Sequence, residues 1–350
     1  MNKRIALIPG DGIGVEVIAE AERVLTALSE RRGLPIELTK LDWGAQKYLR
    51  EGVSLPAGAL DVLRRDFDAI LLGALGDPRV PLNQHAADIL FGIRFGLDLY
   101  VNQRPAKLLD SKLCPLKNCK EEGVNFVILR ENTEGAYAGV GGNFKRDTPD
   151  EVAVQEDVNT RKGVERILVY AFEYAIRHGL EKLCMSDKAN ALTYGHGLWQ
   201  RTFAEVRERY PEVEARHLYV DTLAMEMVRD PAQFEVIVTC NLFGDILSDL
   251  SAALIGGLGV APSANLNPGK ISMFEPVHGS APNIAGKNLA NPTGAILSAG
   301  MMLAELGFSD ESLRIESAAK QAIREGVATP DLGGSRGTRE VGEWISAHLC

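Results

Sequence analysis

The chain has 350 residues, of which 45% are apolar, and its formal net charge is −9 without a long basic run. This length predicts two domains or one large α/β unit, and the acidic balance argues against a nucleic-acid partner. The five cysteines contain no C-x-x-C pair, which is typical of reduced thiols in a cytosolic protein. No apolar run has the length of a signal peptide or approaches the roughly 20 residues of a membrane helix, so we expect a cytoplasmic enzyme with no membrane partner.

Strand-like and helix-like patterns alternate along the chain. A short apolar run at Arg4–Ile8 is followed by a glycine turn at 10–14 and then by apolar residues at helical spacing from Ile18. Further strand-like runs lie at 67–72, 125–129, 182–185 and 234–239. Helical patterns lie at 161–178, 195–210, 221–229, 244–257, 292–306, 312–325 and 335–348. The alternation predicts an α/β fold with a largely parallel sheet covered by helices.

The segment 136–158 departs from this alternation. A glycine-rich stretch leads to a turn at Pro149, and Val152, Val154 and Val158 then alternate with other residues. This pattern predicts a short β-arm of a kind that can pair across a two-fold axis, although a surface hairpin without a partner is the commoner case.

Two carboxylates, Asp245 and Asp249, follow the strand-like run 234–239 at a spacing of four residues. On a helix, this spacing places both on one face with their Cβ atoms roughly 6 Å apart. A solvated surface helix is the simpler interpretation of such a pair. Here, however, the neighbouring residues are apolar: Leu242, Phe243, Ile246, Leu247 and Leu250. A hard divalent cation is therefore the partner that we expect, with Asp221 either as a third ligand or as a helix cap.

Three arginines occur at the ends of elements or on an apolar helix, namely Arg94, Arg104 and Arg130. One such arginine alone usually forms a structural ion pair. Three of them in an acidic protein favour a small polycarboxylate substrate, because guanidinium groups bind carboxylates bidentately. Tyr137 and Lys188 lie in turn-rich segments, where such residues are usually surface groups. As a pair they can supply a proton donor and a proton acceptor.

Two turn-rich segments are candidates for nucleotide binding. The turn G-D-G-I-G at 10–14 lacks the spacing of a dinucleotide fingerprint, so a tight turn beside a ligand cleft is its better interpretation. The segment 274–287 contains glycine, serine and histidine, whose polar and backbone groups can surround a nucleotide. Asn291 follows it and is placed to cap the helix after Pro292.

Taken together, these motifs resemble the metal-dependent, β-decarboxylating dehydrogenases of 2-hydroxy acids, the isocitrate/isopropylmalate dehydrogenase family. The resemblance covers essentially the whole chain and rests on IPGDGIG at 8–14, RENTEG at 130–135, DKAN at 187–190, NLFGDILSD at 241–249, EPVHGSAP at 275–282 and PDLGG at 330–334. It implies a two-domain fold with a large mixed, mostly parallel sheet and a β-arm, 136–158, at a homodimer interface. Residues 1–100 with 256–350 would bind the cofactor, and 101–255 would bind metal and substrate and form the dimer.

The resemblance also implies roles for the polar residues. Arg94, Arg104 and Arg130 would hold the malate carboxylates. Mg²⁺ or Mn²⁺ would be bound by Asp245 and Asp249, with Asp221 from the other subunit. Lys188, also from that subunit, would act as the base on the C2 hydroxyl, and Tyr137 would protonate the enol that remains after CO2 leaves. The cofactor would be NAD, with its adenosine half on His278, Gly279, Ser280, Ala281, Pro282, Asn283 and Asn291.

Substrate and cofactor choice rest on departures within this family pattern. Leu90 and Phe91 offer an apolar wall before Arg94, which favours the isopropyl group of 3-isopropylmalate, whose oxidative decarboxylation to 4-methyl-2-oxopentanoate serves leucine biosynthesis. Ala87 replaces a glutamate that is usual in isopropylmalate enzymes, so tartrate, D-malate, homoisocitrate or isocitrate remain alternatives. A non-catalytic regulatory subunit is a remote one. Asn283 replaces the usual aspartate, so we expect NAD with weaker discrimination against NADP.

Overall fold

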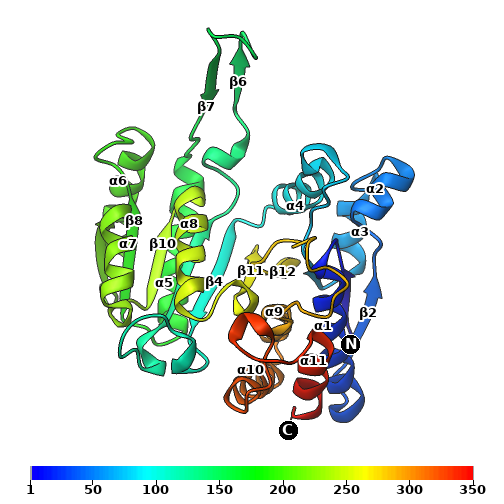
Figure 1. Ribbon diagram of the computed structural model, residues 1–350. Coiled ribbons are helices and arrows are strands. Elements are labelled where there is room, and N and C mark those ends of the chain that lie inside the picture. Colours follow the sequence, from blue (N-terminus) through cyan, green and yellow to red (C-terminus); the bar gives the residue numbers. More distant parts are fainter. Residues whose placement is uncertain (1, 350) are drawn as a thin grey trace. The chain divides into compact units, whose positions relative to one another are not determined.

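The computed structural model describes residues 2–349, so Cys350 lies outside the described residues. The chain divides into two compact units. Unit 1 comprises residues 1–99, 105–124 and 252–350, and unit 2 comprises residues 100–104 and 125–251. Ten strands are ordered β2-β1-β3-β12-β11-β4-β5-β10-β8-β9 in a mixed sheet, and β6 and β7 form a separate two-stranded sheet (Figure 1).

Unit 1 is built mainly from the N-terminal and C-terminal parts of the chain, in which strands alternate with helices. Its elements are β1 (Lys3–Ile8), α1 (Ile13–Arg32), β2 (Ile36–Lys40), α2 (Ala45–Glu51), α3 (Ala59–Asp66), β3 (Ala69–Leu72), α4 (Gln84–Gly96), β11 (Pro262–Leu266), β12 (Ser272–Pro276), α9 (Thr293–Glu305), α10 (Ser309–Arg324) and α11 (Thr338–Ala347). Strands β1, β2, β3 and β12 pair in parallel, whereas β11 pairs with β12 in antiparallel fashion. Helices α1 and α11 pack together, and α9 packs on β11 and β12.

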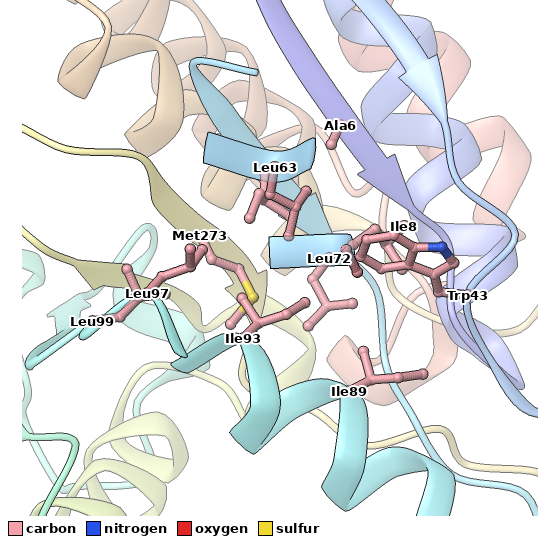
Figure 2. Packing of buried hydrophobic residues seen from close by; sticks show 12 residues of the cluster. Ala6, Ile8, Trp43, Leu63, Leu72, Ile89, Ile93, Leu97, Leu99 and Met273 are labelled. Carbon is pink, nitrogen blue, oxygen red and sulfur yellow. The ribbon is translucent and has the colours of Figure 1, made fainter. Parts of the chain in front are cut away.

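The helix α4 is held by a buried apolar cluster (Figure 2). Ile89 and Ile93 lie one helical turn apart and are fully buried, so both point toward the sheet. They contact a cluster that includes Ile70 and Leu72 of β3 and Trp43. Burying each large aliphatic side chain contributes about 1.5–3 kcal/mol to stability. This burial fixes the rotation of α4 about its own axis, and thereby the direction of its remaining side chains.

Unit 2 is a parallel α/β unit with a protruding hairpin. Its elements are β5 (Asn125–Glu131), β6 (Gly141–Phe144), β7 (Val152–Gln155), α5 (Arg161–Arg177), β8 (Lys182–Asp187), α6 (Gly195–Arg207), β9 (Glu214–Tyr219), α7 (Val220–Arg229), β10 (Val236–Thr239) and most of α8 (Asn241–Leu254). Strand β4 (Val101–Lys107) begins in unit 2 and ends in unit 1. Strands β5, β10, β8 and β9 pair in parallel. The hairpin β6–β7 is antiparallel and stands away from the helices of this unit (Figure 1).

The α/β class and the large, mostly parallel sheet that the sequence predicts are confirmed. The segment 136–158 does form a β-hairpin, whereas its place at a dimer interface and the functions of the two domains stay predictions. Several elements escaped the sequence patterns, namely β2, β4, β9, β11, β12, α2 and α3. Within the described residues, no helix is both long enough and apolar enough to cross a lipid bilayer.

Candidate functional site

The site in unit 2 is built where α8 begins directly after β10. Strand β10 is buried along its whole length, and its neighbour β5 delivers Arg130 to the same end of the sheet. Gly244 in the first turn of α8 makes this possible, because a Cβ there would lie 2.5 Å from Arg130 Cγ. The glycine therefore lets the helix pass directly over a fully buried arginine side chain.

Arg130 lies at the centre of a group of charged side chains, the acid–arginine cluster. This cluster comprises Asp245 and Asp249 of α8 together with Arg104 and Arg130. Nη1 of Arg130 donates to Asp245, and its Nε and Nη2 donate to Asn241 Oδ1 at 3.0 and 2.6 Å. Arg104 Nη1 lies 3.4 Å from Asp245 and 4.0 Å from Asp249. The spacing of four residues thus places both carboxylates on one face beside two guanidinium groups, as the sequence predicted.

Tyr137 completes this acid–arginine cluster. Its Oη donates to Asp245 Oδ2 at 2.8 Å, and its ring centroid lies 5.1 Å from the Arg130 guanidinium carbon. Burial, together with the hydrogen bond to the Asp245 carboxylate, raises the pKa of Tyr137 above its ordinary value. The phenol therefore keeps its proton throughout the neutral range and is available as a donor.

Asp249 lies further out on the same face, with 61% of its side chain exposed against 37% for Asp245. Partial burial, with the nearby Asp245 charge, raises the pKa of Asp249, while Arg104 and Arg130 oppose that shift. Two carboxylates of this kind fit a hard divalent cation, because the cation relieves the repulsion that they exert on each other. Asp245 and Asp249 are the residues of this cluster that would hold such a cation.

Lys188 and Asp221 form a second polar group in unit 2. Lys188 follows β8, Asp221 lies in the first turn of α7, and Lys188 Nζ is 2.6 Å from Asp221 Oδ1. The hydrogen bond from Lys188 lowers the pKa of Asp221, which stays ionised at neutral pH. Asp221 is not the N-cap of α7, which is Tyr219. No three potential metal-ligating side chains gather at one point in the part of the chain that the structure describes, so one chain supplies this pair and the acid–arginine cluster as separate groups.

Arg94 belongs to unit 1, on α4, and its position is set by a buried carboxylate. Its Nη2 donates to Glu275 Oε1 at 2.7 Å, and Asn265 Nδ2 donates to the same oxygen at 2.8 Å. Within the described residues, Arg94 Nε is buried and makes no hydrogen bond, which leaves one edge of the guanidinium for a ligand. Whether Arg94 joins Arg104 and Arg130 around one substrate stays a prediction.

The residues before Arg94 on α4 have mixed roles. Leu90 is half-buried and packs against the apolar cluster of unit 1, and the Phe91 ring stacks on that of Phe95 with centroids 5.7 Å apart. Asp88, next to the departure at Ala87, accepts a hydrogen bond from Ser54 Oγ at 2.8 Å. Asp88 is therefore engaged within unit 1 and is no simple substitute for the missing glutamate.

The glycine turn at 10–14 is a structural joint, that is, a tight turn that is hydrogen-bonded to two other segments of unit 1. Gly10 and Gly12 have φ of 73° and 56°, and a Cβ on Gly12 would lie 2.1 Å from the carbonyl oxygen of Ser280. The amides of Asp11 and Ile13 donate to Ala74 O and Ser280 O at 2.7 and 2.9 Å. These amides are used within the protein, which supports the interpretation of a tight turn over that of a phosphate cradle.

Asp11 extends this joint to three further segments. Its buried carboxylate accepts from Ala45 N at 2.6 Å, from Gly76 N at 2.8 Å and from His85 Nε2 at 2.7 Å. His85 is fully buried in the first turn of α4. The start of this helix is thereby tied to the glycine turn.

The segment 278–283 lies against that turn in unit 1. His278 Nε2 is buried without a hydrogen-bond partner among the described residues, and burial lowers the pKa of His278, so the imidazole is neutral at pH 7. Gly279 has open space where a Cβ would stand, and Asn283 is exposed. An orphaned imidazole nitrogen beside an open glycine and exposed backbone fits a nucleotide better than it fits packing against protein.

Both polar atoms of the Asn291 side chain make hydrogen bonds within the protein. Its Oδ1 accepts from the amide of Thr293, the first residue of α9, at 3.0 Å, and its Nδ2 donates to Asp331 at 3.0 Å. The N-cap of α9 is Pro292 rather than Asn291. The remaining predicted cofactor residues, Ser280, Ala281 and Pro282, lie in the turn after His278, where Ala281 has a φ of 36°.

Sequence reasoning missed the residues that orient these groups. Asn241 and Ser248, which bind Arg130 and Arg104, both occur within the NLFGDILSD string, and Glu275 opens EPVHGSAP. Their presence in these strings was the available signal, but their partners are far away in the sequence. The Asp11–His85 pair had no signal besides the aspartate within the glycine turn.

Comparison with known proteins places the chain in a class of dehydrogenases. The family model described as isocitrate/isopropylmalate dehydrogenase matches residues 4–345. The chain belongs to the isocitrate/isopropylmalate dehydrogenase family.

Two similar proteins within the family carry the same name. The chain is 46% identical to the 3-isopropylmalate dehydrogenase of Thermobifida fusca, over 99% of this chain and 98% of that protein. It is 48% identical to the enzyme of the same name from Corynebacterium kroppenstedtii, over 99% of each. Among solved structures, the isocitrate dehydrogenase from Methylococcus capsulatus matches with a TM-score of 0.90 at 38% identity, over 99% of both chains.

Proposed function

We propose that this chain catalyses the oxidative decarboxylation of (2R,3S)-3-isopropylmalate to 4-methyl-2-oxopentanoate and CO2, with reduction of NAD, as a step of leucine biosynthesis. The observation that carries the proposal is the acid–arginine cluster on α8, in which Asp245 and Asp249 lie beside Arg104, Arg130 and Tyr137. The names of these two relatives support the choice of substrate. The cysteines that the structure describes are free thiols, which supports a cytoplasmic location.

The arginines bind and orient the malate core. Arg104 and Arg130 are almost fully buried and are fixed by Ser248 and Asn241, so little side-chain entropy is lost when a carboxylate binds to them. Arg94, fixed by Glu275, offers its free Nε edge to a second carboxylate. The isopropyl group would meet Phe91 and the exposed part of Leu90, where a third carboxylate would find no cation.

Asp245 and Asp249 would hold Mg²⁺ or Mn²⁺ together with Asp221. When bound, the cation supplies Lewis-acid stabilisation of the developing enolate, and NAD supplies the hydride acceptor at C2. Lys188, oriented by Asp221, takes the proton of the C2 hydroxyl. Tyr137 keeps its proton because of its raised pKa and delivers it to the enol after CO2 has left.

Lys188 and Asp221 reach this site from a second copy of the chain in a homodimer. Supporting this, unit 2 exposes apolar side chains on β6, β7, α7 and α8, as expected of a surface that a partner covers. They are Phe144, Val152 and Val154 of the hairpin, Met225 and Val228 of α7, and Leu242 and Ile246 of α8. Leu242 and Ile246, which are two of the apolar neighbours of the carboxylates in the sequence, are thus exposed in a single chain.

His278 and the turn up to Asn283 would receive the adenosine half of NAD. Asn283 is exposed and offers an amide to the ribose hydroxyls, without the negative charge that would repel a 2′-phosphate. We therefore propose NAD as the cofactor, with incomplete discrimination against NADP.

A substrate panel tests the proposed function. The purified chain is assayed with 3-isopropylmalate, D-malate, tartrate, homoisocitrate and isocitrate, each with NAD and Mn²⁺, and both NADH and CO2 are measured. We expect the highest kcat/KM for 3-isopropylmalate, with one CO2 released per NADH. A higher value for any other acid overturns the substrate, and NADH without CO2 overturns the reaction type.

A matched pair of variants links the activity to the acid–arginine cluster. Asp249→Asn is expected to raise the Mn²⁺ concentration needed for half-maximal activity at least roughly tenfold, since a neutral amide binds a hard cation poorly. Asp61→Asn, at a side chain that is 82% exposed in α3, is the control and should leave it unchanged.

A further inference from the structure

The backbone of Lys188 is fixed at the end of β8 by hydrogen bonds that its proposed role as a base does not by itself explain. The Lys188 carbonyl oxygen accepts from the amides of Ala191 and Leu192 at 2.9 and 2.8 Å. The Lys188 amide donates to Nδ1 of His196 at 2.8 Å. Both backbone groups of Lys188 are therefore occupied, and these contacts set the direction in which its side chain leaves the backbone.

His196 is the second residue of α6, and its imidazole is buried, with 1% of the side chain exposed. The ring meets that of Phe243 edge-on, with centroids 5.2 Å apart. Because Nδ1 accepts the hydrogen bond from Lys188, the proton of the neutral imidazole is on Nε2. This nitrogen faces Asp157, whose Oδ2 lies 3.6 Å away. The ring thus presents its acceptor to the backbone of Lys188 and its donor to a carboxylate.

The carboxylate of Asp157 is itself held in place from α6. Asn159 Nδ2 donates to Asp157 Oδ2 at 2.8 Å, and Trp199 Nε1 donates to Asn159 Oδ1 at 2.8 Å. Trp199 is buried and lies three residues after His196 on the same helix. One face of α6 therefore contacts both ends of this chain of polar groups, which fixes the orientation of the imidazole.

The chain of polar groups ends at Lys188, whose side chain is also fixed at its tip. Lys188 Nζ donates to Asp221 Oδ1 at 2.6 Å and lies 5.8 Å from the centroid of the Tyr219 ring. These contacts hold the amine, and His196 holds the backbone that carries it. Packing alone requires no hydrogen-bond acceptor at His196, because an apolar side chain of similar size would fill the same space. The Nδ1 atom instead satisfies one particular backbone amide, that of Lys188.

We propose that His196 is a positioning residue, which holds the backbone of Lys188 through Nδ1 and so directs the lysine amine to the position from which it takes the proton. The role of Lys188 as the base rests on the proposed function, whereas the contact with His196 does not. An amine displaced by about 1 Å can lose roughly a hundredfold in rate. Loss of the His196 contact should therefore lower kcat, while the arginines still bind the substrate.

Two substitutions of His196 separate the acceptor of its ring from the donor. His196→Asn places an amide oxygen near the position of Nδ1, so the bond to the Lys188 amide is retained and the contact with Asp157 is lost. His196→Gln extends its amide toward the position of Nε2, so the contact with Asp157 is retained and the bond to Lys188 is lost. The control is His178→Gln, at an exposed histidine that follows the last residue of α5.

Amide hydrogen exchange measures the contact without turnover. The whole protein is labelled with ¹⁵N-lysine, the Lys188 signal is assigned by its absence in Lys188→Arg, and exchange is followed by NMR. The Lys188 amide should exchange at least about tenfold faster in His196→Gln than in the wild type, because its acceptor is lost. In His196→Asn and His178→Gln, it should exchange within about threefold of the wild-type rate. Unchanged exchange in His196→Gln overturns the proposal.

Steady-state kinetics test the consequence for the reaction. With 3-isopropylmalate, NAD and Mn²⁺, His196→Gln should lower kcat at least about tenfold and change KM for the acid less than about threefold, and His196→Asn should restore most of kcat. The urea midpoints of the two variants should agree, which excludes a difference in folding. Equal losses of kcat in both variants, or full kcat in His196→Gln, overturn the positioning role. A wild-type chain that is inactive toward every acid refutes the proposed function instead, and hydrogen exchange still decides whether His196 holds Lys188.

Discussion

Replacing Tyr137 by phenylalanine separates two roles that the structure allows for its hydroxyl. The variant removes one oxygen and keeps the ring beside Arg130. The hydroxyl either orients Asp245 through the 2.8 Å hydrogen bond or delivers a proton during the reaction. A hydrogen bond to a charged group contributes about 1.5–3 kcal/mol, and the lower figure applies here because the Asp245 side chain is 37% exposed.

These magnitudes give different expectations for the two roles. Loss of orientation alone amounts to about 1.5 kcal/mol, or roughly tenfold, and would appear mainly as weaker Mn²⁺ binding through Asp245. Loss of a proton donor costs about 10²–10⁴-fold in kcat. We expect Tyr137→Phe to lower kcat by more than about 10²-fold while it changes the Mn²⁺ affinity by less than about tenfold.

The assay measures kcat with saturating 3-isopropylmalate and NAD, and Mn²⁺ affinity by titration of the same protein without turnover. The control is Tyr194→Phe, at a ring that is 95% exposed. A substitution in the core of unit 2, such as Phe172→Leu, is unsuitable because it would disturb the packing of that unit. A fall in kcat of tenfold or less, together with a matching loss of Mn²⁺ affinity, would refute proton delivery and leave Tyr137 as a positioning residue.

Three further predictions address the cofactor turn, the structural joint and the dimer. Asn283→Asp should raise the preference for NAD over NADP roughly fivefold in kcat/KM, since a carboxylate near a 2′-phosphate adds about 1 kcal/mol of repulsion; an unchanged ratio would show that the ribose does not lie beside this residue. Asp11→Ala leaves three donors without an acceptor, including His85, at about 1–3 kcal/mol each, and should lower the urea midpoint clearly more than Asp61→Ala does. Ile246→Asp places a charge on the exposed apolar face of α8 and should shift the chain from dimer to monomer in sedimentation, with loss of activity; an active dimer would count against that interface.

The elements that the sequence revealed are those whose burial imposes a pattern. Strand β10 is buried on both faces and is apolar at nearly every position, so it is visible as a strand. Strand β9 lies at the edge of the sheet and reads Glu-Ala-Arg-His-Leu-Tyr, because an edge strand has no second neighbour and its exposed positions tolerate polar residues. Strand β2 occupies the opposite edge and was missed for the same reason.

The site residues that could be predicted from the sequence are likewise those that depend on local spacing, whereas contacts between distant parts of the chain could not be predicted. Asp245 and Asp249 were found because their spacing on a helix is a local property. That Arg94 is held by Glu275 could not be inferred, because 181 positions separate the two residues and only the folded β12 brings them together. The exposure of Ile246 was missed because an apolar residue on a helix predicts burial without saying whether its own chain or a partner covers it.

Charge balance bears on the proposal that the site binds both a cation and a dianion. In the acid–arginine cluster, Arg104 and Arg130 offset Asp245 and Asp249, so the formal charge of these four side chains is zero. A divalent cation arriving alone meets two guanidinium groups, and a malate dianion arriving alone meets two carboxylates. When both bind, their charges cancel each other as well as those around them. We therefore expect 3-isopropylmalate to raise the Mn²⁺ affinity by about tenfold or more, equivalent to roughly 1.4 kcal/mol of coupling, and Mn²⁺ to raise substrate affinity equally. Calorimetric titration of Mn²⁺ with and without the acid measures this coupling, and equal affinities would show that the cation and the substrate do not share the cluster.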